Sequence, residues 1–301
     1  HTLHSDGSWD VPDLVAAAQR VGLDFATLTD HNTVSGLAQM TSLASESLLT
    51  MGGMELTTYY GHALALGVRE WIDWRVRANE RDMNTIAREV EARGGLFIIA
   101  HPKSKGDPVC TGCDWRYTET MPGVARCVEI WNKGAWYEQN EQALALWYEW
   151  LNAGYRMVAT AGTDIHGQIP EGIRVGFNNI FAEALQESAL LNAVRQGHLY
   201  LSSGPRLELT ACNSVGEEAM MGDAIDDTGV EITCTWNDID TPLQLRLIVD
   251  GAVHDTVAID SPGTQVWSFP AAQHDWIVAE IRDETNELRA VTNPVFLMPK
   301  V

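Results

Sequence analysis

The chain has 301 residues, of which 41 are acidic and 20 are basic, so its formal net charge at pH 7 is −21. This charge argues against binding to nucleic acid or to an anionic membrane surface, because both would repel it. Hydrophobic residues make up 45% of the chain, which is ample for a core. No apolar run approaches the roughly 18 residues needed to cross a bilayer, so we expect no membrane partner. The length predicts one large domain, or a large and a small one.

Five cysteines are too few, and odd in number, for a disulfide framework. They favour a reducing compartment such as the cytoplasm, although a targeting segment ahead of His1 would not be visible in this sequence. Cys110 and Cys113 form an isolated CxxC pair, without a second pair or nearby histidines at zinc spacing. We interpret this pair as two thiols in a surface loop, in preference to a structural zinc site or a redox site.

Apolar runs alternate with helical patterns through the first two thirds of the chain. The expected elements, in chain order, are a helix over 12–22, a strand over 25–29, strands over 48–56 and 62–68, a helix over 84–93, strands over 96–100 and 124–131, a helix over 138–152 and a strand over 157–161. This alternation favours successive βα units, and therefore an α/β barrel or an open α/β sheet.

The pattern changes after Gly204 and Pro205, where helical periodicity stops and short alternating segments begin. Asp250-Gly251 between two such segments predicts a β-hairpin. We therefore predict an α/β domain over residues 1–204, followed by a small antiparallel, β-sandwich-like domain over residues 205–301.

Histidines and carboxylates gather near the ends of the predicted strands. They are His1, His4 and Asp6, then Asp30 and His31, Glu55, His101, Glu129, and Asp164 with His166. The carboxyl ends of strands are where α/β barrels and open sheets build their active sites. Asp164 and His166 alternate, so an extended segment would direct both side chains to one cavity. Imidazoles mixed with carboxylates predict a polynuclear site for zinc, manganese or iron.

Six motifs occur in a fixed order over about residues 1–204. They are His1-Thr-Leu-His4-Ser-Asp6-Gly7, Leu28-Thr-Asp30-His31-Asn32, Gly53-Met-Glu55-Leu-Thr57, Gly61-His62-Ala-Leu-Ala-Leu-Gly67, Ile99-Ala-His101-Pro102 and Gly162-Thr-Asp164-Ile-His166. Together they resemble the PHP (polymerase and histidinol phosphatase) metallohydrolases, specifically the branch of bacterial carbaryl-hydrolase-like proteins. The resemblance implies a distorted (βα)7-type barrel with two or three divalent ions at its carboxyl rim.

The resemblance also implies a ligand set. His1, Glu55 and Asp164 would hold a first metal, Glu55 and His101 a second, and Asp6, His31 and His166 a third. Glu129 stands where many relatives have another ligand of the second metal, usually histidine. The family motif is HxH and His1 matches its second histidine, so the first histidine is expected two positions before this sequence begins, together with half of the first strand.

The expected function is that of a phosphoesterase, in which a metal-bridging hydroxide attacks small phosphate mono- or diesters. A carboxylic ester or carbamate hydrolase with the same metal centre is the alternative. A third hypothesis is a catalytically impaired binding module that the metals stabilise. All three predict a small-molecule ester or ligand as partner, and a homo-oligomer is compatible with each.

Several other side chains are candidates for catalysis and substrate binding. We expect His62 to protonate the leaving group or contact an oxyanion, and Asp164 to act in catalysis as well as in metal binding. Lys103 and Arg174 are candidates for binding a phosphate. Tyr59 and Trp131 are candidates for lining a pocket that accepts an aryl group.

Overall fold

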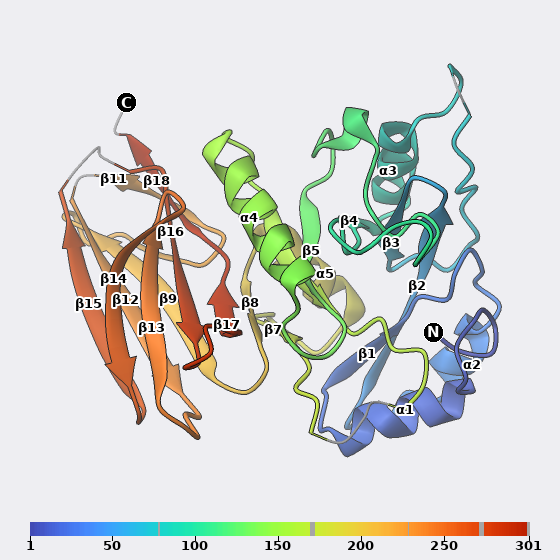
Figure 1. The fold of residues 1–301 in the computed structure, drawn as a ribbon, viewed down its shortest axis with the longest axis horizontal. Coiled ribbons are helices and arrows are strands. Elements are labelled where there is room, and N and C mark those ends of the chain that lie inside the picture. Colours follow the sequence, from blue (N-terminus) through green and yellow to red (C-terminus); the bar gives the residue numbers. More distant parts are fainter. Residues whose placement is uncertain (78, 169–171, 228, 271–273, 300–301) are drawn as a thin grey trace.

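The structure is a computed structural model with two halves of different composition (Figure 1). It describes residues 1–77, 79–168, 172–227, 229–270 and 274–299. The N-terminal half combines helices with a curled sheet, and the C-terminal half consists of strands. Helix α4 (Glu138–Asn152) lies between the two halves.

One six-stranded sheet forms the centre of the N-terminal half. Its strands, in order across the sheet, are β1 (Phe25–Leu28), β2 (Leu49–Thr58), β3 (Gly61–Leu66), β4 (Leu96–Ile99), β5 (Cys127–Asn132) and β6 (Val158–Gly162). Strand β3 runs antiparallel to both of its neighbours, whereas the other neighbouring pairs are parallel. The parallel strands therefore deliver their carboxyl ends to one rim.

Helices pack beside this sheet. They are α1 (Val11–Arg20), α2 (Leu37–Ser42), α3 (Met83–Ala92), α4 and α5 (Glu187–Gln196), with the short 3-10 helix η1 (Thr118–Thr120). The side chains of Asp10 and Asp82 cap α1 and α3 by accepting hydrogen bonds from backbone N–H groups three residues on. Gly197, at φ 80°, ends α5 in the left-handed conformation that favours glycine. None of the helices in the described ranges is long and apolar enough to cross a membrane.

The predicted helices and strands of this half are confirmed, but a closed (βα)7 barrel is not. Strands β2 and β3 form an antiparallel hairpin, so no helix separates them. The connection from β4 to β5 contains η1 as its helical segment instead of a full crossover helix. Strands β1 and β6 remain the two edges of the sheet. The sheet is therefore curled without closing.

A cavity of about 790 Å³ lies inside the curl. Residues of both edge strands line it, together with residues of α5 and of strand β7 (Phe177–Ile180). At one end the cavity reaches His1, Glu55, His101 and Asp164. The open side of the sheet thus leads directly to the strand ends that carry the predicted ligands.

The C-terminal half contains two sheets. Their strands are β7, β8 (Leu199–Ser202), β9 (Arg206–Asn213), β10 (Glu218–Met220), β11 (Ala224–Asp227), β12 (Val230–Asn237), β13 (Leu243–Val249), β14 (Ala252–Ile259), β15 (Gly263–Phe269), β16 (Trp276–Arg282), β17 (Leu288–Thr292) and β18 (Val295–Pro299). One sheet has the order β10-β9-β12-β15; the other has β11-β18-β16-β17-β8-β7, with β13 and β14 attached through β16. Apolar side chains from both sheets form a shared core.

Most strand pairs of this half are antiparallel, as predicted, although β11 and β18 pair in parallel. Asp250 and Gly251 connect β13 to β14, which confirms the predicted hairpin. Strands β7 and β8 fall within the predicted first domain but pair into the larger C-terminal sheet, where β8 contacts β17. The boundary at residue 204 stays a prediction.

Helix α4 is bound to the C-terminal half by polar contacts centred on the buried side chains of Glu280 and Arg282. The Arg282 guanidinium donates to both carboxylate oxygens of Glu141, at 3.0 and 3.1 Å, and to Glu280 at 2.6 Å. The Tyr148 hydroxyl donates to the other oxygen of Glu280 at 2.6 Å. Because each buried charge has a hydrogen-bonded partner, this junction fixes the position of α4 against the strands.

Candidate metal centre

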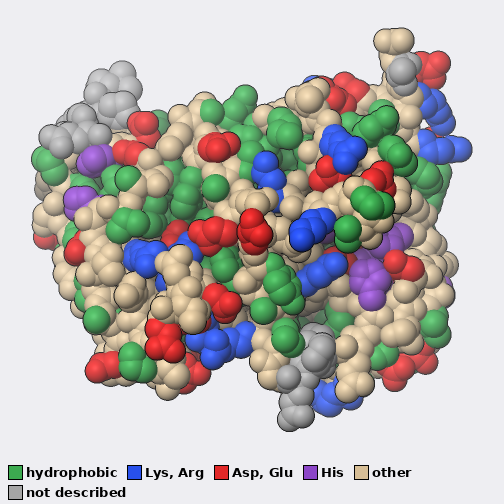
Figure 2. All heavy atoms as spheres, in the orientation of Figure 1, with side chains coloured by type: hydrophobic (Ala, Val, Ile, Leu, Met, Phe, Trp, Pro, Cys, Tyr) green, Lys and Arg blue, Asp and Glu red, His purple; other side chains and the backbone are tan. Residues whose placement is uncertain are grey.

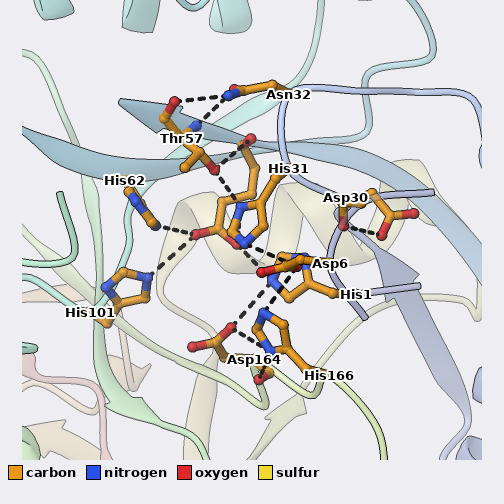
Figure 3. A network of polar contacts seen from close by, with 12 residues as sticks. His1, Asp6, Asp30, His31, Asn32, Thr57, His62, His101, Asp164 and His166 are labelled. Atoms are coloured by element: carbon orange, nitrogen blue, oxygen red, sulfur yellow. Dashed lines mark hydrogen bonds and ion pairs between the residues drawn. The ribbon is translucent and has the colours of Figure 1, made fainter. Parts of the chain in front are cut away.

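The segment that carries His1 and Asp6 has no regular structure and is held in place by Asp30 (Figure 3). The buried Asp30 carboxylate accepts from the Thr2 backbone N–H at 2.6 Å, the Thr2 hydroxyl at 2.7 Å and the Ser5 hydroxyl at 2.8 Å. The His1 amino nitrogen donates to the Ile165 carbonyl at 2.7 Å. These contacts bring His1 beside the segment that follows β6.

Glu55 is the centre of the site. Its Oε2 lies 2.9 Å from His1 Nε2 and 3.7 Å from His31 Nδ1. Its Oε1 lies 2.9 Å from His62 Nδ1 and 3.3 Å from His101 Nε2. Burial raises the pKa of this carboxyl, but hydrogen bonds from His1, His101 and His62 outweigh burial and hold the pKa well below its usual range. Glu55 is therefore an ionised carboxylate with imidazoles on both oxygens.

Asp164 forms a second contact point for His1. Its Oδ1 lies 3.2 Å from His1 Nε2 and 3.5 Å from His166 Nδ1. Its backbone φ is 45°, in the left-handed region that a non-glycine residue rarely adopts, and His101 has φ 29°. Such conformations at the ends of strands are typical of functional sites, where surrounding contacts hold the backbone in place.

Asp6 completes an outer group of ligands. Its Oδ1 lies 3.3 Å from His166 Nε2 and 3.5 Å from His31 Nε2. The His1 ring stacks on His31, with centroids 4.1 Å apart, and also contacts His166 at 4.2 Å. Three rings this close cannot all be protonated without strong repulsion. On the face shown in Figure 2, histidine side chains reach the surface of the N-terminal half beside an acidic side chain.

The donors fit divalent cations. Three groups offer nitrogen and carboxylate oxygen atoms within 4.8 Å of one another: His1, Asp6, His31 and His166; His31, Glu55 and His62; and His1, Glu55 and Asp164. His1 Nδ1 is buried without a hydrogen-bond partner among the described residues. Imidazole nitrogens and carboxylate oxygens with shared members are the donor set of polynuclear zinc, manganese or iron centres.

Glu129 lies beside these groups and belongs to none of them. Its Oε2 accepts from the His101 backbone N–H and from the Asn132 side chain, each at 3.0 Å. Burial raises the pKa of Glu129 to about 7. A Cβ atom at Gly162 would lie 1.6 Å from Glu129 Oε1, so a larger residue there would displace the Glu129 carboxylate. In this structure Glu129 supports the backbone of His101, and its role as a ligand stays a prediction.

The predicted catalytic and substrate residues lie at different distances from the cluster. His62 is buried and belongs to one candidate ligand group, in addition to its predicted catalytic role. Trp131 is 1% exposed, its indole donates to the Gly134 carbonyl, and it lines the same small cavity as Arg174. Tyr59 is 59% exposed. Arg174 lies 3.8 Å from Asp283 and lines a separate cavity of about 180 Å³.

Lys133 is a site residue that the sequence analysis missed. Its Nζ lies 3.6 Å from Asp164 Oδ2, and its side chain is about half exposed, at 52%. Lys103, which was predicted instead, forms a backbone bridge with Asp114 in the loop after β4. Lys133 follows β5 directly, so the argument from strand ends that selected Glu129 would have found it.

The interpretation of Cys110 and Cys113 as two thiols is wrong, because they form a disulfide. A turn between them brings their Cα atoms to 5.5 Å, within the usual range for a disulfide. Sequence spacing alone does not specify this turn. Cys127, Cys212 and Cys234 are free.

Replacing Asp30 by alanine should release the segment that carries His1. Loss of three hydrogen bonds to a buried carboxylate should lower the free energy of unfolding by about 2–4 kcal/mol and should reduce the metal retained after dialysis. Denaturant unfolding and metal analysis measure both effects. Asp24→Ala, at an exposed position just before β1, is the matched control for Asp30, which lies just after that strand. Unchanged metal content in Asp30→Ala would show that the anchor does not support the site.

The metal-free site should bind cations more tightly as pH rises. Burial lowers the pKa of His1, but its contacts with Asp164 and Glu55 dominate and raise it to about 10. Contacts with Glu55 likewise outweigh burial and raise the pKa of His101 to about 9. Each cation must displace the proton on its imidazole, so the affinity of the site with His1 and that of the site with His101 should each increase about tenfold per pH unit below pH 9. Competition with a chromophoric chelator from pH 6.5 to 9 measures this. A flat profile would mean that the two imidazoles are not ligands.

Fold and site together define a mixed α/β protein with a candidate metal centre at its strand ends. No model of a known protein family matches the chain, and no curated protein matches it. The chain is similar to a solved structure from Bacteroides vulgatus, a two-domain protein containing a predicted PHP-like metal-dependent phosphoesterase. The TM-score is 0.52 and the sequence identity is 15%. The match covers 98% of this chain and 93% of that one. The two proteins thus share a fold over nearly their whole lengths.

Two other solved structures are similar over part of the chain. A putative metal-dependent phosphoesterase from Bifidobacterium adolescentis has a TM-score of 0.41 and 17% identity, covering 57% of this chain and 88% of that one. An amidohydrolase from Chromobacterium violaceum, with bound sulfate and no metal, has a TM-score of 0.37 and 14% identity, covering 56% and 86%. These values are too low to carry an argument about this protein.

Proposed function

We propose that this protein is a metal-dependent hydrolase of ester bonds, and that it acts as a phosphoesterase on small phosphate mono- or diesters. The observation that carries the proposal is Glu55, a buried carboxylate with imidazoles on both oxygens. Its shared position between candidate ligand groups suits two or three cations held close together. The fold shared with a two-domain protein containing a PHP-like domain supports membership of that family. The carbaryl-hydrolase-like branch is proposed from the sequence motifs alone.

Each part of the cluster has a distinct task in this proposal. His1, Glu55 and Asp164 would hold one cation, and Asp6, His31 and His166 would hold another. Glu55 and His101 contribute to a further site, to which His62 lies close enough to add a nitrogen. Bound cations would lower the pKa of water and polarise the ester oxygen under attack. The chain supplies no nucleophile of its own in this scheme.

The protein's own groups position the substrate and its protons. Lys133 extends its ammonium group beside Asp164, where it can contact a phosphoryl oxygen. His62, whose Nδ1 lies 2.9 Å from Glu55 Oε1, is proposed to pass a proton from this nitrogen to the leaving group when it does not ligate a cation. No hydrogen bond or ion pair among the described residues joins Arg174, Tyr59 or Lys103 to the cluster, and we propose them as contacts for the remainder of a larger substrate.

Lys133→Met should lower kcat/KM for phosphate esters by about ten- to a hundredfold, because it removes a charged donor beside the reacting group. Steady-state kinetics with an aryl phosphate measure the effect at constant metal content. Lys105→Met is the matched control, because Lys105 is exposed and no ion pair among the described residues joins it to the cluster. Equal kinetics for the two variants would contradict the role of Lys133.

A carboxylic ester or carbamate hydrolase is the second candidate, because the same centre can polarise a carbonyl oxygen. Phosphate release from aryl phosphates and naphthol release from aryl carbamates, both with metal-replete protein, would rank the two functions. If bound metal raises the melting temperature but neither class of ester is hydrolysed, the protein would instead be the metal-stabilised binding module.

A further inference from the structure

The Cys110–Cys113 disulfide lies in the loop that covers the His62 and His101 side of the metal centre. The carbonyl oxygen of Cys113 accepts a hydrogen bond from His101 Nδ1 at 3.1 Å. The carbonyl oxygen of Thr111 accepts one from His62 Nε2 at 3.3 Å. Both acceptors belong to the four residues that the disulfide closes into a ring.

These two hydrogen bonds determine how the imidazoles face Glu55. When His101 donates through Nδ1, its Nε2 is the atom that faces Glu55 Oε1 at 3.3 Å. When His62 donates through Nε2, its Nδ1 faces the same oxygen at 2.9 Å. A hydrogen bond on the far nitrogen of a ligating histidine fixes the tautomer and the ring plane, and typically contributes ten- to a hundredfold to metal affinity.

The rest of the loop is anchored outside the disulfide ring. The Trp115 backbone N–H donates to the Pro102 carbonyl at 3.1 Å, and the Arg116 N–H donates to the Tyr60 carbonyl at 2.7 Å. Inside the ring, a Cβ atom at Gly112 would lie 1.9 Å from the Thr58 carbonyl oxygen, so the ring packs tightly against β2. A change confined to the ring can therefore move the two acceptor carbonyls while both ends of the loop stay in place.

We propose that Cys110–Cys113 is a thiol–disulfide exchange site that controls the metal centre, with a dithiol as its reductant. The inference rests on the proposed metal centre, and it adds a site of regulation to it. One thiolate of the reductant attacks a cysteine sulfur, breaking the protein disulfide and forming a mixed disulfide. The second thiol of the reductant then displaces that cysteine, so two electrons and two protons pass to the protein and the reductant leaves as its own disulfide.

Reagents can reach this disulfide. Both cysteines are partly exposed, and the preceding Val109 is 73% exposed. Cys127 and Cys234 are buried, and burial raises the pKa of the Cys127 thiol to about 12, so it is unreactive as a competing nucleophile. Reduction frees the ring to adopt other turn conformations, and His62 and His101 then lose their fixed acceptors.

The first test is a thiol count on the full protein purified without reductant. Of the five cysteines, the disulfide leaves three free, so alkylation under denaturing conditions should modify three thiols per chain and, after reduction, five. Five thiols without reduction would overturn the proposal.

The second test compares cobalt(II) binding and its visible spectrum in the oxidised protein and in Cys110→Ser/Cys113→Ser, with Cys212→Ser as the matched control. The double variant should bind cobalt at least about tenfold more weakly and show a changed spectrum, whereas the control should match the oxidised protein. Oxidised protein treated with a dithiol, alkylated and desalted should behave like the double variant, with protein alkylated without the dithiol as its control. This keeps the test decisive should the variant fold poorly. Equal affinity and spectra would overturn the proposal. Failure of the oxidised protein to bind cobalt would instead count against the proposed function.

Discussion

Glu55→Gln should empty the metal centre and reduce ester hydrolysis by about a thousandfold or more. The side chain contacts His1, His62 and His101 through two oxygens, and an amide supplies one acceptor oxygen and places an NH2 group at the other position. Loss of a residue that only hydrogen-bonds to a metal ligand typically lowers metal affinity or activity ten- to a hundredfold, so loss of a ligand shared by two metals should lower them more. Metal analysis after dialysis, together with initial rates, measures the effect.

Loss of a buried carboxylate can also act through stability alone, so this prediction needs a control. Glu280→Gln removes an equally buried carboxylate, 2% exposed, from the network of Arg282 and Tyr148 in the C-terminal half. We expect this variant to lose stability and keep its metal. Retention of full metal content and activity in Glu55→Gln would refute the assignment of Glu55 as the shared ligand.

Asp164→Asn should have the second largest effect, lowering kcat/KM by at least about a hundredfold. The aspartate contacts His1 and His166 and lies beside Lys133. Asparagine tolerates the left-handed backbone at this position, so the fold should survive the change. The loss should therefore appear in metal content and rate, with little change in the free energy of unfolding.

Asp250→Asn is the matched control for Asp164→Asn, because the two aspartates have similar geometry. Asp250 also has a positive φ, 50°, and accepts from a histidine, His274, at 2.9 Å, but it lies in the β13–β14 turn of the C-terminal half. We expect unchanged metal content and activity there. Equal losses in the two variants would indicate a general effect of the substitution and would contradict a specific role for Asp164.

The parts of the fold that follow from local sequence could be predicted. The apolar run at 96–100, ended by His101-Pro102, specifies β4 without knowledge of its neighbours. Asp250-Gly251 likewise specifies the hairpin between β13 and β14 through its turn chemistry. The antiparallel placement of β3 and the open edges at β1 and β6 depend on long-range pairing, to which local periodicity is insensitive.

The candidate site also has a part that could be predicted from the sequence and a part that could not. Strand ends indicated Glu55, His101 and Asp164, because a shared rim follows from parallel pairing, and the structure brings these residues together. The hydrogen bonds of Glu129 depend on the conformations of Asn132 and Gly162, which the sequence pattern does not describe. The place of His62 beside Glu55 follows from the register of the β2–β3 hairpin, which the sequence analysis did not derive.

The most direct test of the central claim is a cation titration of exhaustively chelated protein, with bound metal per chain and hydrolysis of an aryl phosphate followed together. The account predicts no turnover in the chelated protein, and activity that returns in step with the binding of two or three zinc, manganese or iron ions. Hydrolysis that survives complete chelation, or a chain that retains no divalent cation at neutral pH, would contradict it.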